Sequence, residues 1–257
     1  MYTLQGGLSL AFCQSPRLAP DLSHNVSIPA HLYLLDGTNT LEIVVYPGPT
    51  PSHAREGGRA VEAKGSATAR LAAYMVGDFT GAPNAPLLLE LAWDAAQAEP
   101  GPYPRSVQVT RNLGPLFGRW GWESAEKLQL DTATIDSAAN VLESIRTSLA
   151  ASNPEVLLRL ATGKFANAAV AFPARPYNVL VEQFRRVVAR DASAPGWAFP
   201  PLDRERFDFR LVAGGRLLEC INRDWRPTLR TAVLSDGYPK YYPLLLCRIH
   251  GEWQVAI

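Results

Sequence analysis

The sequence predicts an α+β protein in two parts: a β-rich first part, then a part in which helices pack on a four-strand antiparallel sheet. Three observations predict this class. Strand patterns separated by Gly and Pro fill residues 1–133, helical periodicity runs from about residue 136 to 190, and closely spaced strand patterns follow residue 201. Residues 1–133 carry 9 Lys and Arg against 12 Asp and Glu (−3), whereas residues 134–257 carry 16 against 12 (+4). We therefore expect two domains, 1–133 and 134–257.

The composition favours a folded protein outside the membrane. A chain of 257 residues with 47% hydrophobic residues can bury a substantial core. No stretch approaches the roughly 18 apolar residues that span a bilayer. The segment Leu10-Ala11-Phe12-Cys13 is similar to a lipoprotein cleavage site, but no Lys or Arg precedes it and Phe12 is too bulky beside a lipidated Cys. We expect a cytoplasmic protein.

Alternating apolar residues from Tyr2 to Phe12 predict a first strand, with a bulge at Gly6-Gly7. The runs His31–Leu35 and Thr40–Tyr46, joined by Asp36-Gly37, predict a hairpin, because Asp-Gly suits the positive φ angles of a tight turn. Further strands are expected at Thr68–Val76, Pro86–Trp93 and Ser106–Asn112. Such spacing is typical of a sheet or a sandwich.

Three helices are expected next. Asp136 is the predicted cap of a helix that ends near Ala150, and Asn153-Pro154 begins a second helix that stops at Gly163. A third helix should run from Pro176 to Arg190. Its predicted buried face holds Val179, Leu180, Phe184, Val187 and Val188, and its predicted solvent face holds Arg185, Arg186 and Arg190.

Four strands are expected at Phe207–Ala213, Arg216–Asn222, Thr228–Leu234 and Tyr242–His250, the last resuming at Trp253–Ile257. Gly214-Gly215 and Ser235-Asp236-Gly237 supply turns, so neighbouring strands should be antiparallel. Helices followed by such a sheet, with the strand–turn–strand ending Cys247-Arg248-Ile249-His250-Gly251-Glu252-Trp253-Gln254-Val255, resemble the NTF2-like and cystatin-like folds. The resemblance covers roughly residues 135–257 and implies an architecture rather than a function.

The chain has no recognisable catalytic, phosphate-loop or metal motif. Gly7-Leu8-Ser9-Leu10-Ala11 lacks the final Gly of a nucleophile elbow, and the four histidines form no close pair. Cys13, Cys220 and Cys247 have no metal spacing, so we expect buried thiols, no metal and no cofactor. An acid–base pair could combine Asp208 with His250 if the sheet aligned them, but the pattern is more typical of a solvated sheet face.

Aromatic residues in two loops are the predicted binding residues. They are Trp197 and Phe199 after the third helix, and Tyr238, Tyr241 and Tyr242 around the Ser235–Pro243 turn. Large aromatic side chains and arginines are enriched in binding hot spots, so Arg223 and Arg226 are expected to pair with acidic groups of a partner. In the alternative interpretation these aromatics cap the core of the sheet.

From Met1-Tyr2-Thr3-Leu4 to Gly251-Glu252-Trp253 the chain resembles two-domain immunity proteins of bacterial type VI secretion systems. The resemblance implies a non-catalytic protein that neutralises a cognate toxin in the cytoplasm, a nuclease being one candidate. We expect neither nucleic-acid nor membrane binding, because the net charge is +1 and no basic run occurs. Two alternatives stay open: a small-molecule binder or enzyme with a pocket in residues 135–257, and a structural subunit of a bacterial assembly.

Overall fold

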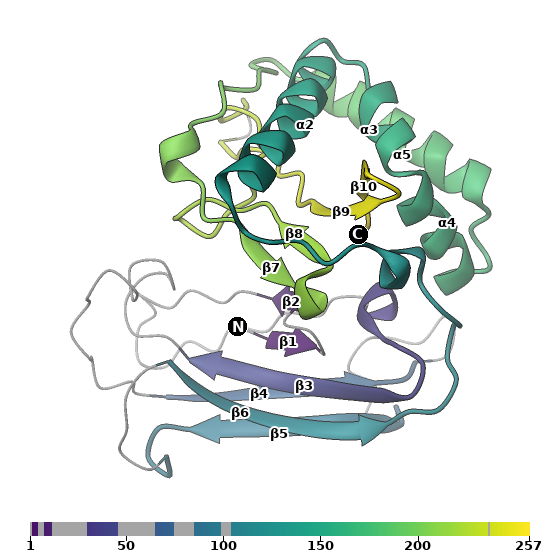
Figure 1. Cartoon of the computed structure of the whole chain (residues 1–257), viewed down its shortest axis with the longest axis vertical. Coiled ribbons are helices and arrows are strands. Elements are labelled where there is room, and N and C mark those ends of the chain that lie inside the picture. The colour runs from purple at the N-terminus through teal and green to yellow at the C-terminus, as the bar shows by residue number, and fades with distance from the viewer. Residues whose placement is uncertain are drawn as a thin grey trace. The chain divides into compact units, whose positions relative to one another are not determined.

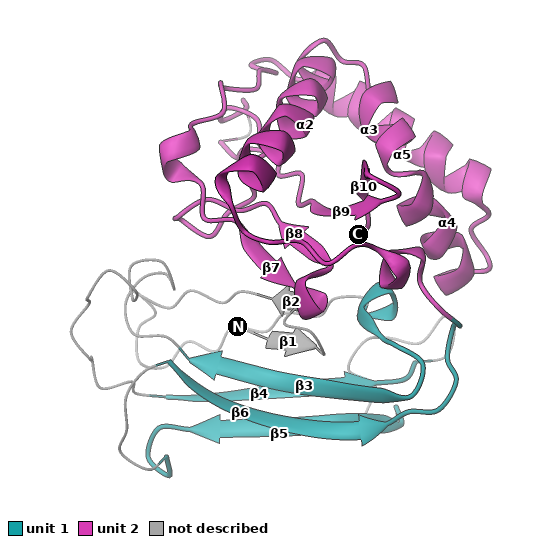
Figure 2. Ribbon diagram, in the orientation of Figure 1, with its two compact units in different colours: residues 1–118 teal, residues 119–257 magenta. Residues whose placement is uncertain are grey.

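A computed structural model describes residues 30–45, 65–74, 85–98, 104–235 and 237–257, together with the backbone of two strands at 2–4 and 8–11. The chain forms two compact units, 1–118 and 119–257 (Figure 2). The boundary between the units therefore lies at residue 118, ahead of the predicted boundary at residue 133. Residues 119–131 belong to the second unit because the Glu126 amide donates to Arg248 O at 2.9 Å and the Leu128 amide to Gly215 O at 2.8 Å. No described helix is long and apolar enough to cross a membrane.

The first unit consists of two antiparallel sheets (Figure 1). One has the strand order β2-β1-β3-β6 and the other pairs β4 with β5. The bounds are β1 Tyr2–Leu4, β2 Leu8–Ala11, β3 Thr38–Val45, β4 Ser66–Ala72, β5 Leu87–Asp94 and β6 Arg105–Asn112. The described residues of this unit hold strands and a single 3-10 turn, which confirms the β-rich prediction. The continuous first strand was wrong, because β1 and β2 pair with each other.

Alternation along the strands builds the core of this unit. Leu41 and Ile43 of β3 are buried in one apolar cluster with Leu71 of β4 and with Leu89 and Trp93 of β5. Side chains on one face of β3 therefore meet the second sheet, as successive residues of a strand point to opposite faces. The two sheets pack through this shared layer.

The predicted hairpin around Asp36-Gly37 was wrong. Residues His31–Tyr33 form a 3-10 turn, and β3 pairs with β1 and β6 instead. The Asp36 carboxylate accepts the amides of Leu116, Phe117 and Gly118 at 2.7, 2.9 and 3.1 Å, and these bonds lower the pKa of Asp36. The turn is thus tied to a segment 80 residues away. Such pairing is non-local, so the dipeptide alone could not reveal it.

The second unit begins with four helices. Their bounds are α2 Thr132–Ala150, α3 Glu155–Leu160, α4 Thr162–Ala171 and α5 Tyr177–Ala192. The predicted cap at Asp136 was wrong, because the Asp131 carboxylate accepts the Thr134 amide at 2.8 Å and starts the helix earlier. The predicted stop at Gly163 was also wrong. Gly163 lies inside α4, and the break falls at Ala161 between α3 and α4.

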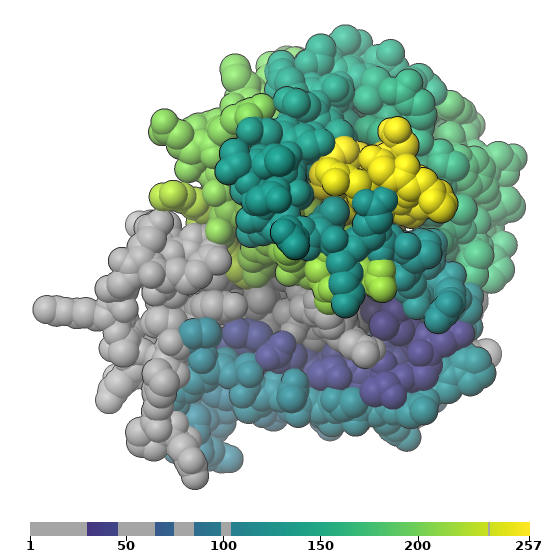
Figure 3. Space-filling model, viewed as in Figure 1, coloured from purple at the N-terminus to yellow at the C-terminus, as the bar shows by residue number. Residues whose placement is uncertain are grey.

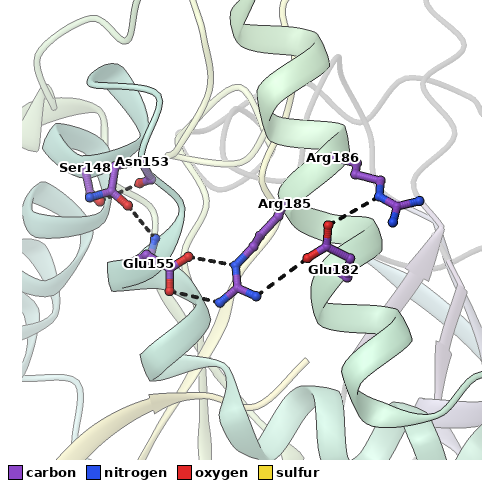
Figure 4. Close-up of polar contacts among 6 residues, drawn as sticks. All are labelled: Ser148, Asn153, Glu155, Glu182, Arg185 and Arg186. Carbon is purple, nitrogen blue, oxygen red and sulfur yellow. Dashed lines mark hydrogen bonds and ion pairs between the residues drawn. The ribbon is translucent and has the colours of Figure 1, made fainter.

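Helix α5 exposes the predicted arginines, which bind carboxylates on its own surface and on α3. Figure 4 shows the Arg185 guanidinium between Glu155 and Glu182; its Nε donates to Glu155 Oε1 at 2.8 Å. Arg186 Nε contacts Glu182 Oε1 at 3.3 Å. Val181 and Val188 are buried, but Val179 is 47% exposed, so its predicted burial was wrong. Two residues apart on a helix, Val179 and Val181 face nearly opposite sides.

The sheet of this unit is antiparallel, with the order β10-β9-β8-β7. The bounds are β7 Arg210–Val212, β8 Leu217–Glu219, β9 Leu245–Ile249 and β10 Glu252–Val255. A four-strand antiparallel sheet was predicted and is present. However, residues 228–234 form a single isolated bridge, between Arg230 and Tyr241, so the strand predicted at Thr228–Leu234 was wrong. β9 pairs directly with β8 through Leu218 and Leu246 and occupies the edge that this segment would need.

An apolar layer joins the helices to the sheet. Leu142, Ile145 and Leu149 of α2 have no exposed surface, and neither have Leu218 and Leu246 of the central strands. Burying a leucine contributes about 1.5–3 kcal/mol. In the space-filling view the C-terminal residues, in yellow, lie among teal atoms of the segment around α2 (Figure 3). The whole helical face therefore depends on this layer.

The start of α2 provides the first test. Asp131→Ala removes the carboxylate that accepts the Thr134 amide, whereas Asp136→Ala removes only an exposed ion pair with Arg204. We expect Asp131→Ala to lower the midpoint of urea unfolding clearly more than Asp136→Ala does, because an unpaired helix N-terminus is the larger loss. The reverse order would restore Asp136 as the cap.

Candidate functional site

Three of the predicted binding aromatics are packing residues. Trp197 Nε1 donates to Leu149 O at 3.0 Å, and its ring meets the ring of Phe199 edge-on at 5.2 Å. Phe199 is buried and lies 5.6 Å from the ring of Tyr242. Burial raises the pKa of Tyr242 to about 12. Trp197, Phe199 and Tyr242 therefore extend the apolar layer below the loops, as the alternative interpretation expected.

The other predicted residues lie together on the surface. Arg223, Arg226, Tyr238 and Tyr241 are exposed and belong to the segment 222–241. The stretches 230–234 and 238–241 run side by side, since the Thr231 amide donates to Lys240 O at 3.0 Å and the Leu234 amide to Tyr238 O at 3.2 Å. The fold thus brings both tyrosines to the loop that carries the two arginines.

The loop 222–226 is held by hydrogen bonds around the buried Asn222. Its amide donates to Arg226 O at 3.0 Å, its carbonyl accepts the Trp225 amide at 2.8 Å, and its side chain lies 3.2 Å from the Thr228 hydroxyl. This closes a tight turn in which Trp225 adopts a φ of 59°. That conformation is costly for a bulky side chain, by roughly 1–3 kcal/mol.

The indole of Trp225 offsets part of that strain. It is buried and lies beneath the Arg210 guanidinium, whose central carbon is 3.8 Å from the ring centroid. Arg210 in turn forms a partly buried ion pair with Glu219 on the neighbouring strand β8. A cation over an aromatic face is stabilised by the ring quadrupole, more so when both are desolvated. The sheet therefore anchors the loop from below.

Positive charge exceeds negative charge along this surface. The segment 222–241 has three Arg and one Lys against two Asp, a net charge of +2. The Asp224 carboxylate accepts a hydrogen bond from Arg230 at 2.9 Å and lies 3.4 Å from the Arg206 guanidinium. Arg206 thereby adds a further positive charge beside the loop. We call Arg206, Arg223, Arg226, Tyr238 and Tyr241 the arginine–tyrosine face. It is a rigid surface that offers cationic and aromatic groups together.

The sheet does not assemble the acid–base pair that strand alternation suggested. Asp208 lies before β7 and its amide donates to Ile221 O, whereas His250 lies in the turn between β9 and β10. The register Arg210↔Glu219↔Leu245 places them at opposite ends of the sheet, roughly 20 Å apart along the strands. Arg248 of β9, two residues before His250, stacks on Trp253.

The described cysteines are structural. Cys220 and Cys247 are buried free thiols, as predicted. Burial raises the pKa of both, that of Cys247 to about 11, so neither is a thiolate at neutral pH. Cys13 lies outside the described residues. Within those residues, no group of three potential ligand side chains could hold a metal ion.

Lys164 is a feature that the sequence analysis missed. It lies in the first turn of α4, and its ammonium has neither a hydrogen bond nor an ion pair with any described residue. Burial lowers its pKa to about 8. In the sequence, the neighbouring Gly163 is the local sign that this turn packs closely: in the structure it approaches the Gln254 side chain of β10. A glycine indicates close packing and does not indicate a chemical role for Lys164.

Comparison with known proteins supplies no relative. No family model matches the chain, and neither a curated protein nor a solved structure is similar to it. The likeness of residues 135–257 to NTF2-like folds therefore stays a prediction.

The strained turn gives a second prediction. Trp225→Ala and Trp225→Gly both remove the buried indole, but only glycine adopts a positive φ without penalty. We expect the glycine variant to be more stable than the alanine variant by about 1 kcal/mol in urea unfolding, the reverse of the usual order. Equal stability of the two variants would show that the turn carries no strain.

Lys164 gives a third prediction. Below pH 8 the amine is charged in both states and folding bears the whole cost of burying the charge; this cost falls as pH rises from about 8 to 10.5, the pKa of an ordinary lysine. Because the residue keeps some contact with solvent, we expect Lys164→Met to stabilise the protein by on the order of 1–2 kcal/mol at pH 7.

The gain from Lys164→Met should shrink toward zero between pH 8 and 10.5. Urea unfolding at a series of pH values measures this gain, and Lys127→Met, at an exposed lysine, is the control. A gain that stays constant with pH would mean that improved packing, not the removal of a buried charge, is responsible.

Proposed function

We propose that this chain is a non-catalytic immunity protein that neutralises a cognate bacterial toxin in the cytoplasm by binding it through the arginine–tyrosine face. The observation that carries the proposal is the loop 222–226, whose strained conformation is stabilised by Asn222 and Trp225. This loop exposes Arg223 and presents Arg226 next to Tyr241. Strained residues are retained where a fixed geometry serves a function.

The residue types on this face support protein binding. Tyrosine and arginine are enriched at the centres of interfaces, because they bring large contact area and several hydrogen-bond donors on few rotatable bonds. Tyr238 is 72% exposed. Binding that covers this ring would remove apolar surface from water.

Aromatic and positively charged side chains occur together on the face, which also supports the proposal. Trp197 and Phe199 pack in or against the core, whereas Tyr238 and Tyr241 are exposed. These tyrosines share the face with Arg206, Arg223 and Arg226. Complementary charge speeds encounter and selects the partner, which suits a protein that must recognise one toxin.

The test begins with affinity capture from the native host, followed by reconstitution of the captured protein with the purified chain. We expect a stoichiometric complex, and we expect the partner alone to arrest growth of a sensitive cell that coexpression of the chain protects. Tyr241→Ala should weaken the complex about 30-fold, the effect of a hot-spot residue worth about 2 kcal/mol.

Trp197→Ala is the matched control, because this partly buried residue packs against the core and does not belong to the proposed surface. It should lower stability, and any folded fraction should bind the partner with unchanged affinity. A partner without toxicity, or a complex that tolerates Tyr241→Ala and Tyr238→Ala together, would refute the proposed function or the proposed surface respectively.

A further inference from the structure

Arg226 and Tyr241 form a pair that offers only hydrogen-bond donors to the outside. Arg226 Nη1 donates to the Tyr241 hydroxyl oxygen at 2.6 Å, and the guanidinium carbon lies 5.7 Å from the tyrosine ring centroid. Because this oxygen accepts, the hydroxyl proton points elsewhere, and the guanidinium keeps its other N–H groups. The pair therefore suits a ligand that accepts several hydrogen bonds.

The partner of Arg226 sets it apart from its neighbours. Arg206 and Arg230 contact the Asp224 carboxylate, and on α5 Arg185 and Arg186 contact glutamates. Within the described part of the chain, the hydrogen-bond partner of the Arg226 guanidinium is a neutral tyrosine oxygen. A guanidinium of this kind can still pair with a carboxylate, as the others do, and can do so through two parallel hydrogen bonds, as Arg185 does with Glu155.

The backbone around the pair is fixed before any ligand arrives. Arg226 O accepts the Asn222 amide at 3.0 Å, and the Arg226 amide donates to Asp224 Oδ1 at 3.2 Å. Tyr241 forms an antiparallel bridge with Arg230. A preorganised donor pair loses little conformational entropy when it binds, so a single contact can contribute strongly to affinity.

The surroundings favour a protein carboxylate over a nucleic acid. The segment 222–241 has a net charge of only +2, because Asp224 and Asp236 offset two of its four basic residues. Nucleic-acid binding needs many cations along a backbone. In the stretches 230–234 and 238–241, which run side by side, Val233 and Tyr238 are 65% and 72% exposed and offer apolar contact to a peptide.

We propose that the arginine–tyrosine face binds an acidic segment of the partner protein, in which one carboxylate accepts hydrogen bonds from Arg226 and from the Tyr241 hydroxyl. The inference rests on the proposed function and names the chemistry of its partner. The inference also predicts which surface of the toxin is bound. That surface is acidic, so it is distinct from any basic groove in which a nuclease would bind its substrate.

The captured partner, titrated calorimetrically with variants of the full chain, tests the inference. We expect Arg226→Gln to weaken binding by about 10- to 100-fold, as for loss of a hydrogen-bonded charge, and Tyr241→Phe by about 3- to 10-fold. Arg226→Lys should fall between wild type and Arg226→Gln, since it keeps the charge but not the fork. Arg186→Gln, an exposed arginine of α5, should change affinity less than about twofold.

Charge exchange locates the partner group. Arg226→Glu should abolish binding, and lysine at one acidic position of the partner should restore it. A complex that forms normally with Arg226→Gln would overturn the inference while leaving the proposed function intact. Absence of any partner would instead overturn the proposed function.

Two probes decide the ligand class without the partner. A glutamate–tyrosine copolymer peptide should bind the wild-type chain more tightly than Arg226→Gln, and a single-stranded oligonucleotide of similar length should not bind at physiological salt. Oligonucleotide binding that is lost in Arg226→Gln would assign the face to nucleic acid and overturn the inference. Equal binding of the peptide to both chains would overturn it as well.

Discussion

The apolar layer between α2 and the central strands governs what the second unit displays. Leu142, Ile145 and Leu149 meet Leu218 and Leu246 with no exposed surface, and this contact requires β8 and β9 to lie next to each other. Once they pair, residues 228–234 cannot join β8 on the side that β9 occupies. The segment is left as a loop with one isolated bridge, between Arg230 and Tyr241.

Sequence patterns predicted what depends on local spacing. The buried positions of α2 follow from the 3.6-residue period, which is a property of adjacent turns. The position of the N-cap could not be predicted in this way, because Asp131 and Asp136 are equally suitable cap residues. What distinguishes them is the hydrogen bond that the Thr134 amide donates to Asp131. Strand pairing is non-local, so the β-branched run at Thr228–Leu234 had the composition of a strand without the neighbour that makes one.

The candidate surface was predicted in part, for a similar reason. Aromatic composition identified both loops, but only tertiary packing separates Trp197, whose indole reaches Leu149 O, from Tyr241, whose hydroxyl faces solvent with Arg226. The 14 arginines of residues 134–257 looked alike in the sequence. The structure divides them by partner, since Arg185 and Arg186 are neutralised by glutamates, whereas among the described residues Arg226 binds a tyrosine oxygen. Exposed ion pairs contribute little stability, so on α5 they mainly cancel charge.

Trp225 connects the core to this surface. No sequence signal marks a tryptophan for a φ of 59°, a conformation usually left to glycine or asparagine. Glycine there would relieve the strain, but it would remove the indole that lies beneath Arg210 and with it the link to Glu219 and the sheet. A large buried side chain therefore holds the loop in an unfavourable backbone conformation. The contact of this indole with Arg210 fixes the turn that carries Arg226, without regular secondary structure.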